Sequence, residues 1–208
     1  MKTQTVIFDF DGTIADSLET VITIYRELTG DDRPLTRAEI DELRKLPVNK
    51  LIKAVGVPLW RVPALLTRGR RLMHGHLKDV TIFPGLPEVI KQLHDSGVVL
   101  HIVSSNSKAN VEEFLSRHDM RQYFSEIHGS IGLFQKTKTL KSIMLRYRLD
   151  PKATWYVGDE ARDVTASRKA GIAVVSVTWG YQHRDLLEKM NAQHLADTPQ
   201  QLLETVSS

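Results

Sequence analysis

The chain has 208 residues, enough for one well-buried core with a small inserted segment but too few for two full catalytic domains. An apolar fraction of 41% and a charged fraction of 25% are typical of a folded globular protein, and the lack of cysteine excludes disulfides and thiolate chemistry. No apolar run is long enough to predict a membrane span, and 28 basic against 25 acidic residues give no long basic run that would favour nucleic acid. The first residues show no leader pattern, so we expect a cytoplasmic protein.

Short apolar runs alternate with helical patterns along most of the chain. Strand-like runs occupy Thr5 to Phe10, Val98 to Ser104, Thr154 to Gly158 and Ile172 to Val177, with a short extra candidate at Ser125 to Gly129. Helical periodicity covers Leu86 to Ser96, Lys108 to His118 and Thr137 to Tyr147. Strands that alternate with helices predict an α/β fold, a Rossmann-like doubly wound parallel sheet with helices on both faces.

A long segment without strand signals follows the first strand. About seventy residues separate that strand from Pro84, which is too many for a plain loop. Helices are expected from Asp16-Ser17 through Tyr25, from the Thr36 to Glu39 capping box onward, over Lys50 to Val55 and over Val62 to Leu77. We therefore expect a core of residues 1–15 and 83–208 and an inserted all-helical cap of residues 16–82.

Two acids leave the first strand two positions apart, in the run Val6-Ile7-Phe8-Asp9-Phe10-Asp11-Gly12-Thr13. Side chains of an extended chain repeat with period two, so Asp9 and Asp11 are expected on the same side of the strand end. Carboxylates that face one small volume repel each other unless a cation or a proton lies between them. Gly12 permits a sharp turn there. Because Asp and Gly are also common in ordinary turns, the motif gains its weight from further motifs downstream.

Three later segments place polar side chains after strand-like runs or at a helix start. Ser105 and Asn106 follow the second run, with Ser104 one position before them. Lys136 and Lys138 open a helical pattern. The last segment is Gly158-Asp159-Glu160-Ala161-Arg162-Asp163. Strand ends of a parallel sheet meet at one edge, where ligands bind, so these side chains are expected to converge.

In this order the four segments resemble the motifs of the haloacid dehalogenase superfamily, in its phosphoglycolate phosphatase-like branch, whose members carry a helical cap at this insertion point. The resemblance implies that Asp9 is the nucleophile that forms an aspartyl-phosphate and that Asp11 is the general acid and base. Lys136 is implied as the lysine that clamps the phosphate, in preference to Lys138, because of its spacing from the last motif. The other implied phosphate-binding residues are Gly12, Thr13, Ser105 and Asn106.

The resemblance also implies one Mg²⁺ as cofactor. Its ligands would be Asp9, the backbone carbonyl of Asp11, and Asp159, with Asp163 supporting the site directly or through water. Magnesium takes oxygen ligands and retains several waters, which suits a few carboxylates. Arg162 is interpreted as a solvated residue at a helix start, an interpretation that also fits Glu160.

The function these features imply is hydrolysis of a small, phosphoglycolate-like phosphate monoester. A sugar phosphomutase of the same fold and a non-catalytic protein that binds a phosphorylated ligand remain alternatives. Asp11 and Asp159 argue against a dehalogenase, and Lys53, in an ordinary helical pattern, argues against a Schiff-base phosphonate hydrolase. Expected partners are a small-molecule substrate, with no nucleic acid and no membrane, and the expected state is a monomer or homodimer.

Substrate identity has no motif of its own. The basic side chains of the cap that would meet an anionic substrate tail, unless they are simply solvated, are Arg61, Arg68, Arg70, Arg71, His74 and His76. Trp179 and Tyr181, after the last strand-like run, are interpreted as packing residues.

Overall fold

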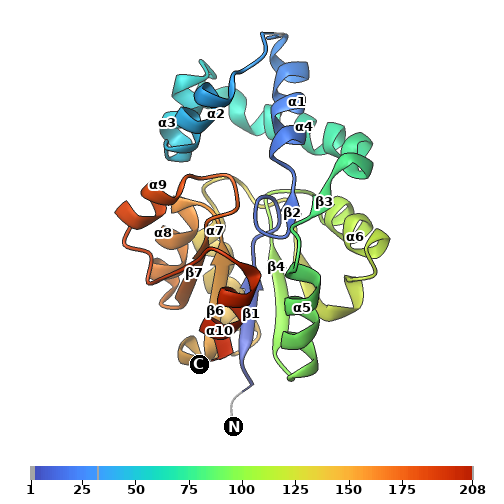
Figure 1. Cartoon of the computed structure of the whole chain (residues 1–208), viewed down its shortest axis with the longest axis vertical. Coiled ribbons are helices and arrows are strands. Elements are labelled where there is room, and N and C mark those ends of the chain that lie inside the picture. The colour runs from blue at the N-terminus through green and yellow to red at the C-terminus, as the bar shows by residue number, and fades with distance from the viewer. Residues whose placement is uncertain (1–2, 32, 208) are drawn as a thin grey trace.

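A six-stranded parallel sheet forms the centre of the molecule, seen here in a computed structural model that describes residues 3–31 and 33–207 (Figure 1). In sheet order the strands are β5 (Phe124–His128), β4 (Val99–Val103), β1 (Thr5–Phe8), β6 (Thr154–Gly158), β7 (Ala173–Val177) and β8 (His194–Ala196). All neighbours pair in parallel. The predicted α/β fold is confirmed, and each predicted strand is present with ends within two residues of those expected.

Both faces of the sheet are covered by helices. Along β1, Val6 and Phe8 point into one apolar core while Ile7 points into the other, as the period of a strand requires. The first core includes side chains of α5 (Leu86–Asp95), α6 (Lys108–Arg117) and α10 (Pro199–Ser207). The second includes side chains of α7 (Lys136–Arg146) and α8 (Ala161–Ala170). Burial on both faces explains why the central strands are continuous apolar runs.

Four helices follow β1 and stand beyond the carboxyl ends of the sheet strands (Figure 1). They are α1 (Leu18–Thr29), α2 (Arg37–Arg44), α3 (Val48–Ala54) and α4 (Val62–His76), and we refer to them as the cap helices. The capping box at the start of α2 is present: Glu39 N donates to Thr36 Oγ1 at 3.2 Å, and Thr36 N donates to Glu39 Oε2 at 2.8 Å. The division into residues 1–15 plus 83–208 and residues 16–82 stays a prediction.

A short antiparallel ribbon joins the cap helices to the sheet. Its strands are β2 (Ala15–Asp16) and β3 (Thr81–Ile82), with Ala15 opposite Ile82 and Asp16 opposite Thr81. The sequence analysis was wrong in expecting no strand before Pro84, whereas the helix that it expected near Asp16-Ser17 is present from Leu18. Two-residue strands have no periodicity that a sequence pattern could reveal.

Other short elements were not predicted either. After β7 come α9 (Arg184–Lys189), β8 and α10, and single turns of 3₁₀-helix lie at Leu59–Arg61, Leu77–Asp79, Arg121–Tyr123 and Pro151–Ala153. Within residues 3–31 and 33–207, none of the helices is both long and apolar enough to cross a bilayer.

Two histidine rings, on β4 and β5, lie beside the ring of Tyr147 at the end of α7. The His101 ring stacks on His128 at 6.2 Å and meets Tyr147 at 5.2 Å between centroids. His101 is 2% exposed, and its Nδ1 has no hydrogen-bond partner among the described residues. Burial, with a smaller contribution from His128, lowers the pKa of His101 from 6.5 to about 4.

We expect His101 to destabilise the fold in acid. The unfolded chain binds a proton on this imidazole near pH 6.5, whereas the folded chain does so only near pH 4, so stability falls as the pH drops through this window. The loss is on the order of 3 kcal/mol between pH 7 and pH 4. In urea titrations across this range, His101→Phe, which keeps an aromatic ring, loses less stability than the wild type. The exposed His74→Phe is the control, and parallel losses in wild type and His101→Phe would contradict this assignment.

Candidate functional site

Asp9 lies directly after β1, at the carboxyl end of the central strand. Its backbone N–H continues the sheet by donating to Val157 O at 2.8 Å. Phe10 N donates to Asp9 Oδ1 at 2.8 Å, which fixes the carboxylate over the strand end. The side chain is buried. Asp9 therefore presents a nearly immobile carboxylate with its second oxygen, Oδ2, turned to a lysine.

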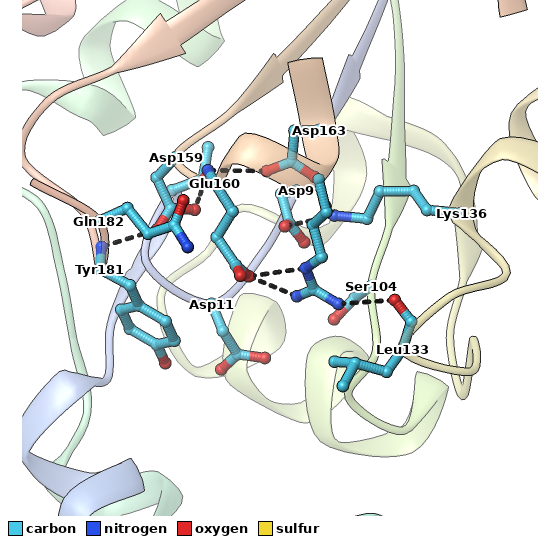
Figure 2. Close-up of polar contacts among 12 residues, drawn as sticks. Asp9, Asp11, Ser104, Leu133, Lys136, Asp159, Glu160, Asp163, Tyr181 and Gln182 are labelled. Carbon is cyan, nitrogen blue, oxygen red and sulfur yellow. Dashed lines mark hydrogen bonds and ion pairs between the residues drawn. The ribbon is translucent and has the colours of Figure 1, made fainter. Parts of the chain in front are cut away.

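That lysine is Lys136, the first residue of α7. Its Nζ donates to Asp9 Oδ2 at 2.6 Å and also to Asp163 Oδ1, so one ammonium bridges two acids (Figure 2). Burial alone would lower the pKa of Lys136, but the Asp163 and Asp9 carboxylates outweigh it and hold the pKa above its usual value. Lys138, the alternative in the sequence analysis, is exposed. The structure thus brings Lys136, and not Lys138, to Asp9.

Asp159 and Asp163 complete an acidic cluster after β6. One carboxylate oxygen from each of Asp9, Asp159 and Asp163 lies within 4.8 Å of the others, and all three residues are buried. Burial first, and then the charges of Glu160 and Asp9, raises the pKa of Asp159 well above its usual value. Burial also raises the pKa of Asp163 to about 6, with Lys136 opposing the shift. The cluster thus carries more negative charge than its surroundings compensate.

The loop after Asp9 packs directly against Asp159. Thr13 Oγ1 donates to Asp159 Oδ1 at 2.8 Å, and Tyr181 N donates to Asp159 Oδ2 at 2.7 Å. Gly12 has φ +77°, and a Cβ there would overlap the Asp159 carboxylate and lie 2.8 Å from the Tyr181 ring. Only glycine fits this position. Gly12 N and Thr13 N donate to Ala15 O and Phe10 O, so these two N–H groups are engaged within the loop.

Asp11 lines a cavity whose walls are formed by the cap helices. Its Oδ1 accepts hydrogen bonds from Ser17 Oγ at 3.0 Å and from Asn106 Nδ2 at 3.4 Å. Burial, followed by the nearby charge of Asp9, raises the pKa of Asp11 to about 6. A carboxyl group with this pKa holds or releases a proton near neutral pH, which is what an acid and base must do.

The polar residues after β4 divide between two environments. Ser104 is fully buried, accepts a hydrogen bond from Asn106 N at 2.9 Å, and lies among the acids and Lys136 in Figure 2. Ser105 is half-buried and lines the cavity together with Asn106. The sequence analysis selected Ser105 and placed Ser104 one position off the motif, so both serines are now candidates for contacts to substrate.

Arg162 and Glu160 correct one prediction, because neither is solvated. The Glu160 Oε1 accepts from both Nε, at 2.9 Å, and Nη2 of Arg162, and Arg162 Nη1 donates to Leu133 O at 3.4 Å (Figure 2). Glu160 is buried and Arg162 is nearly so. The largely buried guanidinium of Arg162 is paired with the Glu160 carboxylate, as buried charges normally are. The sequence of the helix start does not reveal this pairing.

The cavity between the cap helices and the site has a volume of about 400 Å³. Its floor includes Asp11, Ser105, Asn106, Glu160 and Arg162, and its walls are mostly apolar side chains of the cap helices, such as Val21, Leu43, Leu51 and Leu65. Its size and its apolar walls with few polar groups are typical of a small-molecule site. Of the basic cap residues named in the sequence analysis, only Arg70 lines it.

The cap helices are fastened to this site by hydrogen bonds onto backbone carbonyls. Arg44 Nε and Nη2 donate to Tyr181 O and Gly180 O, each at 2.9 Å. Gln182 accepts from Ala161 N at 2.6 Å and donates to Leu46 O at 3.2 Å, so it joins α8 to the loop before α3. The Tyr181 and Ser17 hydroxyls lie 2.7 Å apart. Tyr181 is thus part of the polar site as well as a packing residue.

Comparisons with known proteins agree with this geometry. Residues 6–177 match the family model of the haloacid dehalogenase-like hydrolases. The chain is 35% identical over 206 residues to a phosphoglycolate phosphatase of Synechococcus elongatus, covering 98% of this chain and 97% of the relative. Its fold is similar to that of a predicted phosphatase from Clostridium acetobutylicum (TM-score 0.84, 17% identity, 100% and 99% coverage). It is also similar to that of a haloacid dehalogenase-like family hydrolase from Streptococcus pneumoniae (TM-score 0.79, 18% identity, 98% coverage of each).

Proposed function

The chain belongs to the haloacid dehalogenase-like hydrolases and is a phosphatase, and from this premise we propose that it hydrolyses a small phosphate monoester through an aspartyl-phosphate with the help of Mg²⁺. The observation that carries the proposal is the pairing of two aspartates with different surroundings. Asp9 is buried and held by Lys136, whereas Asp11 faces the cavity and has a pKa of about 6. One carboxylate is suited to attack and the other to proton transfer.

In the first step a carboxylate oxygen of Asp9 attacks phosphorus, and the bond from phosphorus to the ester oxygen breaks. The leaving alkoxide takes the proton of the Asp11 carboxyl group and departs as an alcohol into the cavity. Asp11 is suited to this role because its raised pKa keeps part of the population protonated near neutral pH. The hydrogen bond from Phe10 N to Asp9 Oδ1 supports attack by limiting the carboxylate to one orientation.

In the second step Asp11, now a carboxylate, takes a proton from water as that water attacks phosphorus. The bond between phosphorus and Asp9 breaks, inorganic phosphate leaves and the Asp9 carboxylate is restored. The hydrogen bonds from Ser17 and Asn106 stabilise the charged form of Asp11 that this step requires. Both steps therefore use the same carboxyl group, which gives one proton to the leaving group and takes another from water.

The proposed phosphate contacts come from Lys136 and from the strand end after β4. The Lys136 ammonium neutralises charge beside the reacting centre, and the Ser105 hydroxyl and Asn106 amide are donors at the cavity floor. Ser104 is added to this set because it is fully buried directly after β4 and its hydroxyl contacts Asn106 N. Since the N–H groups of Gly12 and Thr13 are engaged within their loop, we propose that these two residues act by giving the phosphate room and by holding Asp159.

The acidic cluster fits a magnesium ion. Its donors are oxygen atoms only, and the ammonium of Lys136 pairs with Asp9 and Asp163 but not with the third buried carboxylate, Asp159. Burial is the main cause of the raised pKa values of Asp159 and Asp163, and a divalent cation would relieve the repulsion between carboxylates that adds to it. We propose Asp9, Asp159, Asp163 and the Asp11 backbone carbonyl as the residues that would hold it. When bound, the ion would supply positive charge to the phosphate oxygens.

Removal of one proposed ligand is expected to weaken Mg²⁺ binding. Phosphate release should stop when a chelator is added and return with Mg²⁺. Asp159→Ala should raise the Mg²⁺ concentration for half-maximal activity by about tenfold or more. The control is Asp185→Ala, which removes an exposed acid of α9. An unchanged Mg²⁺ titration in Asp159→Ala would place the ion elsewhere.

The function is tested by phosphate release from a panel of phosphorylated metabolites that includes phosphoglycolate, since the Synechococcus relative bears that name. Steady release with Mg²⁺ supports the proposal. A phosphoenzyme that persists and returns its phosphate to a sugar would favour the phosphomutase instead. The cytoplasmic location, the monomeric or homodimeric state, the lack of nucleic-acid and membrane partners and the two-part division of the chain remain proposals.

A further inference from the structure

Three cations line the cavity, and they differ in what they contact. Arg44, Arg70 and Arg162 are the basic residues of its lining among the described part of the chain, with no lysine or histidine. Arg162 is paired with Glu160. Arg44 donates to two carbonyls and lies 3.4 Å from the Asp41 carboxylate. Two of the three guanidinium groups therefore already face an acid.

Arg70 is the exception. It lies on α4, and its Nε donates to Ser105 O at 2.6 Å while Nη2 donates to Ile131 O at 3.2 Å. No acidic side chain within residues 3–31 and 33–207 forms an ion pair with it. A guanidinium has five N–H donors, so these two bonds leave three for a ligand. Burial without a counter-charge lowers the pKa of Arg70, and it remains a cation.

The position of Arg70 is close to the proton that the leaving group would receive. Arg70 contacts Ser105, whose neighbour Asn106 donates to Asp11 at 3.4 Å, and all four residues line the same cavity. The adjacent residues Ser105 and Asn106 at the end of β4 thus contact the guanidinium of Arg70 and the carboxylate of Asp11, respectively. Asn110 Nδ2 donates to Arg70 O at 2.8 Å, which also fixes this turn of α4 against α6.

We infer that Arg70 is the specificity residue of the cavity and binds a carboxylate on the leaving group, so that the substrate is a phosphorylated hydroxy acid. This inference rests on the proposed function. The apolar walls strengthen the attraction, since a charge pair gains more in a poorly polarisable setting than in water. Among the basic residues that line the cavity in the described part of the chain, Arg70 is the one that forms no ion pair, so a substrate carboxylate would bind there. A planar guanidinium with free donors matches a carboxylate in geometry.

The test compares two substrates that differ in the carboxylate. Phosphoglycolate and ethyl phosphate both have a CH₂ group next to the ester oxygen, but only phosphoglycolate carries a carboxylate beyond it. The wild type should prefer phosphoglycolate. In Arg70→Gln, kcat/KM for phosphoglycolate should fall about 10- to 100-fold further than kcat/KM for ethyl phosphate. Arg70→Lys, which keeps the charge, should recover part of the preference.

Matched controls are available on the same helix. Arg68 and Arg71 are exposed, do not line the cavity, and carry the same charge, so Arg68→Gln and Arg71→Gln should leave the ratio of the two substrates unchanged. Equal losses on both substrates in Arg70→Gln would show that Arg70 only fastens α4 to Ser105 and would overturn the inference. Wild-type activity of Arg70→Gln on both substrates would overturn it too. If the wild type releases phosphate from neither compound nor from any other ester, the proposed function fails and the inference falls with it.

Discussion

Asp9→Asn removes turnover while the protein stays folded. The amide keeps the shape of the side chain and still accepts the hydrogen bond from Phe10 N at its oxygen, but it lacks the anionic oxygen that attacks phosphorus. We expect phosphate release to fall by about 10⁴-fold or more, on the scale seen when a nucleophile is removed. Thermal unfolding should change little, because Lys136 keeps its ion pair with Asp163 and the substitution removes one charge from a crowded acidic cluster.

Asp16→Asn is the matched control for this change. Asp16 lies seven positions further on in β2 and is exposed, so the same substitution there should leave activity intact. Trapping with radiolabelled substrate should label the wild type on Asp9 and leave Asp9→Asn unlabelled. Turnover near the wild-type rate in Asp9→Asn would exclude the covalent mechanism.

Lys136→Met should impair both activity and stability. The change removes the ammonium that bridges Asp9 and Asp163 and leaves two buried carboxylates without it. Loss of one partner from a buried ion pair costs about 3–5 kcal/mol of unfolding free energy, and loss of one charged donor at a reacting centre costs about 10²- to 10³-fold in kcat. The stability loss should be larger at pH 8 than at pH 5. Without the ammonium the pKa of Asp163 rises further above its wild-type value of about 6, so this acid is protonated and uncharged at pH 5.

Lys138→Met provides the comparison, because Lys138 lies two residues later in α7 and is exposed. It should match the wild type in urea denaturation at both pH values and in phosphate release. If Lys138→Met lost activity and Lys136→Met did not, the alternative lysine of the sequence analysis would be the correct one.

The fold was predictable because strands and helices have local periodicity. The acidic cluster was predictable because parallel strand ends meet at one edge, which brings Asp159 to Asp9. That Asp9 and Asp11 lie on one side stays a prediction, since β1 ends at Phe8 and period two holds only within a strand. The choice between Ser104 and Ser105 depends on where β4 ends, and a shift of one residue turns a side chain to the other face. Sequence patterns locate such an end only to within a few residues.

Arg162 and Arg70 were not predictable in the same way. Arg162 is buried because Glu160 and the Leu133 carbonyl receive its donors, and Leu133 is distant in the chain. Arg70 was one of six basic cap residues with no feature to distinguish it, since what sets it apart is the turn of α4 that meets the end of β4. Contacts between segments far apart in sequence leave no periodic pattern in either segment.

The ribbon of β2 and β3 has a mechanical consequence for catalysis. It is continuous with the loop that carries Asp11, because Gly12 N donates to Ala15 O at 2.9 Å and Phe83 N donates to Ile14 O at 3.3 Å. Any swing of the cap helices relative to the sheet has to be transmitted through these few peptides. The pivot of such a swing and the holder of the proton donor are therefore one piece of chain, so a movement that opened the cavity to an ester would also move the Asp11 carboxyl. Admission of the ester and delivery of the proton would then be coupled through the same few peptides.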